Sequence, residues 1–346
     1  MRNFKLLFIL LFVLSACATK TPQQPEPIII AYAMNRGDVP DPTHITHINY
    51  AFGHVNETFN GIMINRPTNP NANNNNEVRE TSEDRLRAIV ALKKQKPDLK
   101  VVLSIGGWGS GRFSEMAADE TNRKAFVADC KRVVDEFNLD GIDMDWEYPT
   151  SSSSGISSSP EDTDNFTLLM REIREILGKD KLLTFASAAN ARYVDFKAVE
   201  PYVDFINIMT YDMGMPPYHH SGLYPSEKTR RSGEESVDLH IAAGIPPNKL
   251  TLGIPFYGKG EPRINIHDIA SHSDEYTEQW DDVAKVPYLT NKDGEFVYTY
   301  ENVRSIALKC EFLKQRGLLG AMYWQYSGDD EAGTFRKTVY DGVMNK

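Results

Sequence analysis

Three carboxylic acids stand at alternate positions in one short, otherwise apolar segment. Asp143, Asp145 and Glu147 are each two residues apart, and large apolar side chains separate them. Because successive side chains of a β-strand point to opposite faces, a strand here places all three acids on one face. Carboxyl groups that crowd together repel each other when ionised, so at least one should keep its proton near neutral pH. A protonated acid beside an ionised one can serve as a general acid and base.

Strand-like and helix-like segments alternate along the rest of the chain. Amphipathic stretches that predict helices lie between apolar runs that predict strands. The eight predicted strands span residues 28–34, 45–52, 100–106, 141–146, 182–188, 203–211, 250–257 and 318–324. This alternation is typical of a parallel sheet, and eight β/α units in series favour a closed barrel. We therefore predict the α/β class and a single (β/α)₈ or TIM barrel, with the acids on its fourth strand.

The segments that follow the strands should gather at one end of the barrel, where enzymes with this fold carry their active sites. Three of them are unusual: an Asn-rich stretch at 67–76, a Ser-rich stretch at 151–159 and an insertion at about 258–300. The insertion lies between the seventh and eighth strands and is short for a separate domain. We therefore expect a low cleft wall there, with Arg263 as its candidate basic contact.

The segment 140–147 resembles the D-G-x-D-x-D-x-E signature of family-18 glycoside hydrolases, the chitinase family. The segments 104–108, 209–212 and 322–324 are similar to that family's motifs on the third, sixth and eighth strands, and they follow in the expected order. The resemblance covers residues 28–346. It implies a TIM-barrel enzyme that hydrolyses β-1,4-linked N-acetylglucosamine polymers such as chitin.

The resemblance also implies a role for each acid. Glu147 would donate a proton to the glycosidic oxygen, and the substrate's own acetamido group would act as the nucleophile, so that configuration is retained. This substrate-assisted route is an exception to the usual scheme of two enzymic carboxylates. Asp145 would orient the acetamido group, and Asp143 would share a proton with Asp145.

Further side chains are expected to bind the substrate. The resemblance implies that the Tyr211 hydroxyl bonds to the acetamido group and that Asp212 binds sugar hydroxyls. Aromatic rings present apolar faces against which the C–H faces of sugars can pack. Trp324 is therefore expected to form the floor under the reacting sugar, and Trp108 to hold an outlying one. The remaining wall is expected to come from Met209, Tyr32 and Phe52.

Charge and composition exclude several kinds of partner. A net charge of −10 without a run of Lys and Arg argues against binding to nucleic acid. The paired histidines at 44–47 and 219–220 have no accompanying carboxylate at metal-ligand spacing. The implied chemistry needs no metal, so we expect neither a metal nor another cofactor. The expected partner is an N-acetylglucosamine-containing glycan, and the expected state is a monomer.

The N-terminus carries a targeting pattern. Arg2 and Lys5 precede an apolar run at 6–14, which is too short to span a membrane and is typical of a signal peptide. The quartet that ends in Cys17 resembles the lipobox of bacterial lipoproteins. We expect a signal peptide at 1–16, a lipidated Cys17, a tether through residue 27 and a catalytic domain at 28–346. The protein would then lie in the bacterial cell envelope and meet the membrane only through its lipid; a plain secretory signal is the alternative.

Two other interpretations of the barrel stay open. One is an endo-β-N-acetylglucosaminidase that cuts the core of N-glycans, and the other is a non-catalytic chitin-binding lectin on the same fold.

The helices that carry Cys130 and Cys310 should lie on opposite sides of the barrel, too far apart for a disulfide. We therefore predict two free, buried thiols.

Overall fold

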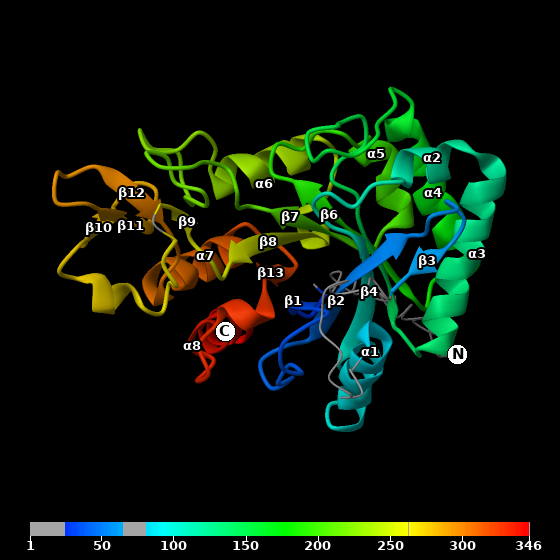
Figure 1. Cartoon of the computed structure of the whole chain (residues 1–346), viewed down its shortest axis with the longest axis horizontal. Helices are drawn as coiled ribbons and strands as arrows, with labels where there is room; N and C mark the ends of the chain where they lie inside the picture. The colour runs from blue at the N-terminus through cyan, green and yellow to red at the C-terminus, as the bar shows by residue number, and fades with distance from the viewer. Residues whose placement is uncertain (1–24, 65–80, 262, 346) are drawn as a thin grey trace, which may run out of the picture.

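The computed structural model describes residues 25–64, 81–261 and 263–345 (Figure 1). Parallel strands run in the order β1-β13-β8-β7-β6-β5-β4-β2, and β2 pairs again with β1, which closes the barrel. These strands are β1 (Ile28–Met34), β2 (His47–Val55), β4 (Lys100–Gly106), β5 (Gly141–Asp145), β6 (Leu182–Ala188), β7 (Phe205–Met209), β8 (Leu250–Pro255) and β13 (Gly320–Trp324). The predicted (β/α)₈ barrel is confirmed, and every predicted barrel strand overlaps an observed one.

Helices cover the outside of the barrel (Figure 1). They are α1 (Ser82–Ala91), α2 (Phe113–Ala118), α3 (Glu120–Glu136), α4 (Asp162–Leu177), α5 (Phe196–Val199), α6 (Gly233–Ala242), α7 (Val303–Gln315) and α8 (Thr334–Met344). Short 3₁₀ turns lie in the segments between helices and strands: η1 (Leu92–Lys94), η2 (Glu200–Tyr202), η3 (Pro247–Lys249), η4 (Ile269–His272) and η5 (Tyr326–Gly328). Side-chain caps begin several helices, among them reciprocal capping boxes at Thr81 for α1 and at Ser232 for α6.

The alternation of side chains on β5 decides where its acids lie. Ile142, Met144 and Trp146 all belong to the large core between the strands and the helices. The Trp146 ring stacks on Phe113 of α2 with centroids 5.3 Å apart and meets Phe166 of α4 at 6.3 Å. The opposite face of β5 must therefore point into the barrel. Its acids share that interior with a small apolar cluster: Ile30, Tyr32, Ala51, Ala186, Phe205, Met209, Leu319 and Met322.

The insertion after β8 forms a small sheet of its own. Its strands are β9 (Lys259–Gly260), β10 (Thr277–Asp281), β11 (Val286–Thr290) and β12 (Phe296–Thr299), in the antiparallel order β10-β11-β12-β9. This sheet lies at the end of the molecule opposite to α3 (Figure 1). The remaining strand, β3 (Ile62–Met63), pairs with β2 as a short hairpin.

Both predicted free thiols are confirmed. Cys130 on α3 and Cys310 on α7 are buried and form no disulfide. Burial raises the pKa of the Cys310 thiol to about 12, so it stays protonated and packs as a small apolar group. The predicted signal peptide, Cys17 and the Asn-rich stretch at 67–76 lie outside the described residues. Within the described ranges, no helix is long and apolar enough to cross a membrane.

Candidate active site

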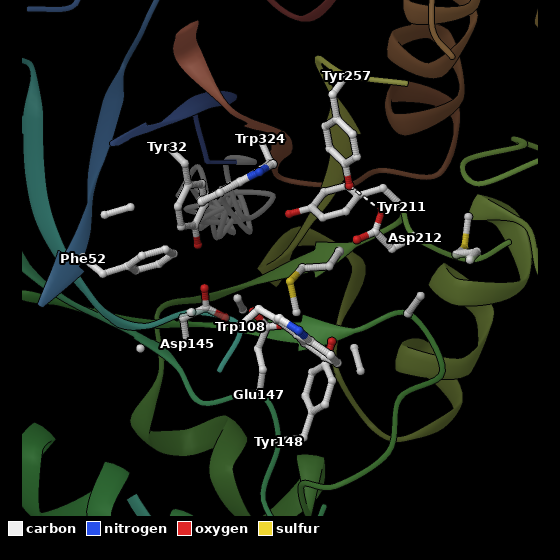
Figure 2. Close-up of a pocket in the computed structure, with 18 of the residues that line it drawn as sticks. Tyr32, Phe52, Trp108, Asp145, Glu147, Tyr148, Tyr211, Asp212, Tyr257 and Trp324 are labelled. Atoms are coloured by element: carbon white, nitrogen blue, oxygen red, sulfur yellow. Dashed lines mark hydrogen bonds between the residues drawn. The ribbon is translucent and has the colours of Figure 1, made fainter. Parts of the chain in front are cut away.

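The carboxyl-terminal ends of the barrel strands open into a cavity of about 1010 Å³. The predicted side chains that line it are Tyr32, Phe52, Trp108, Asp145, Glu147, Met209, Tyr211, Asp212 and Trp324. Asp143 is fully buried beneath them and does not reach the cavity wall. In Figure 2, Tyr32, Phe52 and Trp324 lie above Asp145 and Glu147, and Tyr148 lies beside Glu147. The barrel thus gathers these predicted site residues at one end.

Asp143 is held by donors from four different strands. It accepts hydrogen bonds from Thr184 Oγ1 at 2.6 Å, from the Tyr32 hydroxyl at 2.8 Å and from Ser104 Oγ at 2.8 Å. Asn207 Nδ2 adds a longer contact of 3.3 Å. Burial raises the pKa of Asp143, whereas these donors oppose the rise because they stabilise the carboxylate. Of the three acids on the β5 face, Asp143 is therefore the one whose negative charge receives the most hydrogen bonds and whose position is most constrained.

Asp145 lies in the opposite situation. Its Oδ1 atom is buried and has no hydrogen-bond partner among the described residues. Burial raises the pKa of Asp145 well above its usual value, and the charges of Glu147 and Asp143 raise it further. Without donors to stabilise a carboxylate, the surroundings of Asp145 favour its protonated form.

Glu147 lies two residues beyond the end of β5 and is only partly buried. Burial raises the pKa of Glu147 to about 7; a hydrogen bond from the Tyr148 side chain opposes this rise, and the charge of Asp212 adds to it. A carboxyl group with such a pKa is populated in both protonation states near neutrality. It can therefore donate a proton in one step and accept one in the next.

Tyr211 presents a hydroxyl donor that the protein hardly uses. Within the described residues it donates to Met322 Sδ at 3.7 Å, and a thioether sulfur is a weak acceptor. Burial, together with the charges of Asp145 and Glu147, raises the pKa of Tyr211 well above its usual value. The hydroxyl therefore stays protonated and remains available to donate to a bound ligand.

Asp212 is an anion on the far side of the cavity. Its Oδ1 atom accepts a hydrogen bond of 2.5 Å from the Tyr257 hydroxyl, drawn dashed in Figure 2, and lies 2.8 Å from Lys259 Nζ. His220 Nδ1 lies 3.7 Å from the same oxygen. Burial alone would raise the pKa of Asp212, but the contacts with His220, Lys259 and Tyr257 outweigh it and lower the pKa. Asp212 therefore stays ionised.

Aromatic rings form the floor and the rim. The Trp324 ring stacks on Phe52 with centroids 5.6 Å apart and meets Tyr32 at 5.7 Å. At the rim, Trp108 is 64% exposed and its ring centroid lies 6.4 Å from that of Tyr148. An exposed indole beside a cavity offers a stacking surface to a ligand that extends out of it.

Residues 23–329 match the family described as Glycosyl hydrolases family 18. The chain belongs to this family. It is 32% identical to Chitinase A1 of Niallia circulans over 84% of this chain and 53% of that protein, so it spans about half the length of this relative. Chitinase ChiA of Flavobacterium johnsoniae is 25% identical over 99% of this chain and 29% of its own length.

Solved structures of the family agree with the fold. A family-18 N-acetylglucosaminidase from Paenibacillus barengoltzii has a TM-score of 0.79 at 32% identity and covers 92% of this chain and 100% of its own. The Group IV chitinase of Ostrinia furnacalis in complex with allosamidin has a TM-score of 0.78 at 27% identity, over 91% of this chain and 98% of its own.

Sequence analysis missed several cavity residues of this family-18 barrel. Tyr148, Tyr193, Tyr257, Lys259 and Arg231 all line the cavity. The expectation for Arg263 was wrong: that side chain is exposed and is not among those lining the cavity, and Lys259 makes the basic contact instead. Lys259 and Tyr257 are two residues apart just beyond β8. This spacing after a barrel strand could have identified both as cavity residues.

The predicted low wall can now be described more closely. Among the described residues of the insertion at 258–300, Lys259 is the one that lines the cavity.

No group of three or more His, Cys, Asp or Glu side chains in the described part of the chain is arranged to hold a metal ion.

Proposed function

We propose that this protein hydrolyses β-1,4-linked N-acetylglucosamine polymers by a retaining, substrate-assisted mechanism. The observation that carries the proposal is the pair at the end of β5: Glu147, with a pKa of about 7, next to Asp145, which holds a proton without any donor to stabilise its anion. Relatives that are named chitinases and the N-acetylglucosaminidase with the same fold support the choice of substrate.

The first step transfers the proton of Glu147 to the glycosidic oxygen. The bond between this oxygen and the anomeric carbon breaks, while the acetamido carbonyl oxygen of the same sugar bonds to that carbon. The product is a cyclic oxazolinium ion. Asp145 would orient the acetamido group and share a proton with Asp143, so that negative charge can lie next to the cation. The free hydroxyl of Tyr211 would donate to the acetamido group.

The second step restores the enzyme. Water attacks the anomeric carbon from the side that the leaving group has vacated, and Glu147 accepts its proton as a general base. Two inversions at one carbon retain its configuration. The floor made by Trp324 and Phe52 supports the reacting sugar, and Asp212 accepts hydrogen bonds from sugar hydroxyls.

The mechanism makes the acetamido group of the substrate essential. Fully deacetylated chitosan should resist hydrolysis because it lacks the internal nucleophile, and a thiazoline mimic of the oxazolinium ion should inhibit. Product analysis on acetylated chito-oligosaccharides and on a high-mannose N-glycan tests the substrate class. Release of short N-acetylglucosamine chains or monomers supports the proposal, whereas cleavage of the N-glycan alone would favour the endo-β-N-acetylglucosaminidase.

We further propose that Cys17 carries a lipid that anchors the enzyme in the cell envelope. The support is the pattern of Arg2, Lys5, the apolar run at 6–14 and the quartet that ends in Cys17. Cys17→Ser should abolish uptake of a labelled fatty-acid analogue and leave hydrolysis of soluble oligosaccharides unchanged, since every site residue lies beyond residue 28. Wild-type protein that takes up no label would identify a plain secretory signal.

A further inference from the structure

The segment 219–221 of the loop between β7 and α6 is buried against the insertion. The His220 amide donates to Thr299 Oγ1 of β12 at 3.3 Å. One residue earlier, His219 Nε2 lies 3.2 Å from Asp281 Oδ2 of β10. Both histidines are fully buried. Two strands of the small sheet therefore hold this segment in place.

A buried ion pair holds the last residue of the segment, Ser221. Lys309 Nζ of α7 donates to the Ser221 carbonyl at 2.7 Å and to its hydroxyl oxygen at 2.9 Å. Lys309 is paired with Glu301, which also accepts a hydrogen bond from the Ser221 hydroxyl. All three side chains are almost fully buried. Because separating a buried ion pair is costly, the position of the segment is strongly constrained.

The same segment supports the turn that carries Asp212. Asp212 has a φ angle of 58°, in the left-handed region that residues with a side chain rarely adopt. The next amide, that of Met213, donates to the His220 carbonyl at 3.0 Å. A Cβ atom added at Gly214 would lie 2.6 Å from the His219 carbonyl oxygen, so the two stretches are in direct contact. The backbone at Asp212 is therefore packed against segment 219–221.

The His220 ring presents a nitrogen to the Asp212 carboxylate. Nδ1 lies 3.7 Å from Asp212 Oδ1, and the ring centroid lies 5.3 Å from that of Tyr257. Neither ring nitrogen has a hydrogen-bond partner among the described residues, although buried polar atoms rarely lack one. An N–H group at Nδ1 attracts the carboxylate, whereas a lone pair there repels it. The electrostatically favoured ring therefore has its proton on Nδ1, whether it carries one proton or two.

We propose that His220 is a positioning residue, whose Nδ1–H group holds the Asp212 carboxylate in place from the buried side. This inference rests on the proposed function, in which Asp212 accepts hydrogen bonds from sugar hydroxyls. Tyr257 and Lys259 contact the same Oδ1 atom and line the cavity, whereas His220 does not line it. The insertion thus acts on the site chiefly from behind, by fixing the segment that carries His220.

The first test uses the wild-type protein without substrate. In protein labelled with ¹⁵N-histidine, the imidazole nitrogen shifts show which ring nitrogen carries a proton. The signals of His220 are those that are absent from His220→Asn. We expect a proton on Nδ1 at neutral pH. A His220 ring whose single proton lies on Nε2 overturns the inference.

The second test asks whether His220 acts through the charge of Asp212. His220→Phe keeps a ring against Tyr257 and removes both nitrogens, so kcat/KM for a soluble acetylated chito-oligosaccharide should fall about two- to tenfold. In the Asp212→Asn background the same change should alter kcat/KM by less than about twofold, because the carboxylate is already absent. His220→Asn has an Nδ2–H₂ group in place of Nδ1–H and should stay within about twofold of the wild type. Equal losses in both backgrounds, or no loss in the wild-type background, would show that His220 does not act through Asp212.

His219→Phe is the matched control, because it makes the same change at the neighbouring buried histidine, which contacts Asp281 instead of Asp212. It should alter kcat/KM by the same factor with and without Asp212→Asn. A dependence on Asp212 as large as that of His220→Phe would assign the effect to the whole segment and overturn the inference. If His220→Phe does not fold, the position of the proton in the wild type decides. A wild-type enzyme that cuts no acetylated chito-oligosaccharide overturns the proposed function, whereas failure of either His220 test with an active enzyme leaves that function standing.

Discussion

The two sides of the cavity treat the same chemical group in opposite ways. On the side of β5, Asp145 and Glu147 have raised pKa values because burial acts on carboxyl groups that have few or no donors. On the side of β7 and β8, burial also acts to raise the pKa of Asp212, although its side chain is 51% exposed, yet its pKa is lowered because His220, Lys259 and Tyr257 contact it. Desolvation is common to both sides, and the number of donors and cations decides the sign of the shift.

This contrast separates two functions within one cavity. The β5 side holds protons that can be transferred, and the far side holds a fixed negative charge that can accept hydrogen bonds. Divergent environments of this kind are how enzymes assign different roles to chemically identical groups. Asp143 stands between the extremes, since it is fully buried like Asp145 but receives four hydrogen bonds. Variants that remove a proton or a hydrogen-bond donor on one side, or a cation or donor on the other, should therefore have predictable effects.

The largest effect is expected from removing the transferable proton. Glu147→Gln keeps the shape of the side chain and should lower kcat by about 10²–10⁴-fold, the contribution typical of one general acid. Binding of acetylated oligosaccharides, measured by calorimetry, should be retained because the aromatic floor and Asp212 are untouched. Turnover close to that of the wild type would show that the proton comes from another group.

The dependence of kcat/KM on pH should report the ionisation of Glu147 on the β5 side directly. Glu147 acts as an acid, so kcat/KM should fall about tenfold per pH unit above its pKa of about 7. Tyr148→Phe removes the hydrogen bond that lowers this pKa, and it should move the alkaline limb of the profile to higher pH. An alkaline limb that stays in place in this variant would mean that a different group controls it.

A smaller effect is expected on the far side. Lys259→Gln removes the cation 2.8 Å from Asp212, so the pKa of Asp212 should rise towards its ordinary value. Protonated Asp212 can no longer act as a pure acceptor, so kcat/KM should begin to fall near about pH 4 and should be several-fold lower at about pH 3 than at pH 6, within the range of one charge-assisted hydrogen bond. The wild type should lack this acidic loss. Tyr257→Phe should change the profile in the same direction, and a profile that is unchanged in both variants would contradict the assignment.

The smallest effect concerns stability. The folded state raises the pKa of Glu147 from 4.5 to about 7 and so binds its proton more tightly than the unfolded chain does. The resulting stabilisation is fully present below pH 4.5 and is lost as the pH rises through about 7. Glu147→Gln cannot ionise, so its Tm should fall by about 4 °C less than that of the wild type between pH 5 and pH 8. Equal losses of Tm in the two proteins would show that burial of this carboxyl carries no such linkage.

Local periodicity was enough to predict the barrel and its catalytic strand. The alternation around Asp143, Asp145 and Glu147 assigns side chains to faces without knowledge of any neighbour, because the two-residue period of a strand is a local property. The order of apolar and amphipathic runs then favoured one closed topology. The same reasoning placed Cys130 and Cys310 on separate helices, and the structure confirms that both are free.

Only the tertiary structure decided what surrounds these groups. The donors of Asp143 come from β1, β4, β6 and β7, and Asp212 meets Lys259 and Tyr257 from beyond the next strand. Arg231 reaches the cavity although it lies almost twenty residues along the loop from Asp212. Such contacts depend on how the strands close and how the loops return over them, which no local period encodes. The sequence alone therefore determined which side chains share the β5 face, whereas the closed barrel decided their protonation states, because a pKa depends on burial and on neighbours that are distant along the chain.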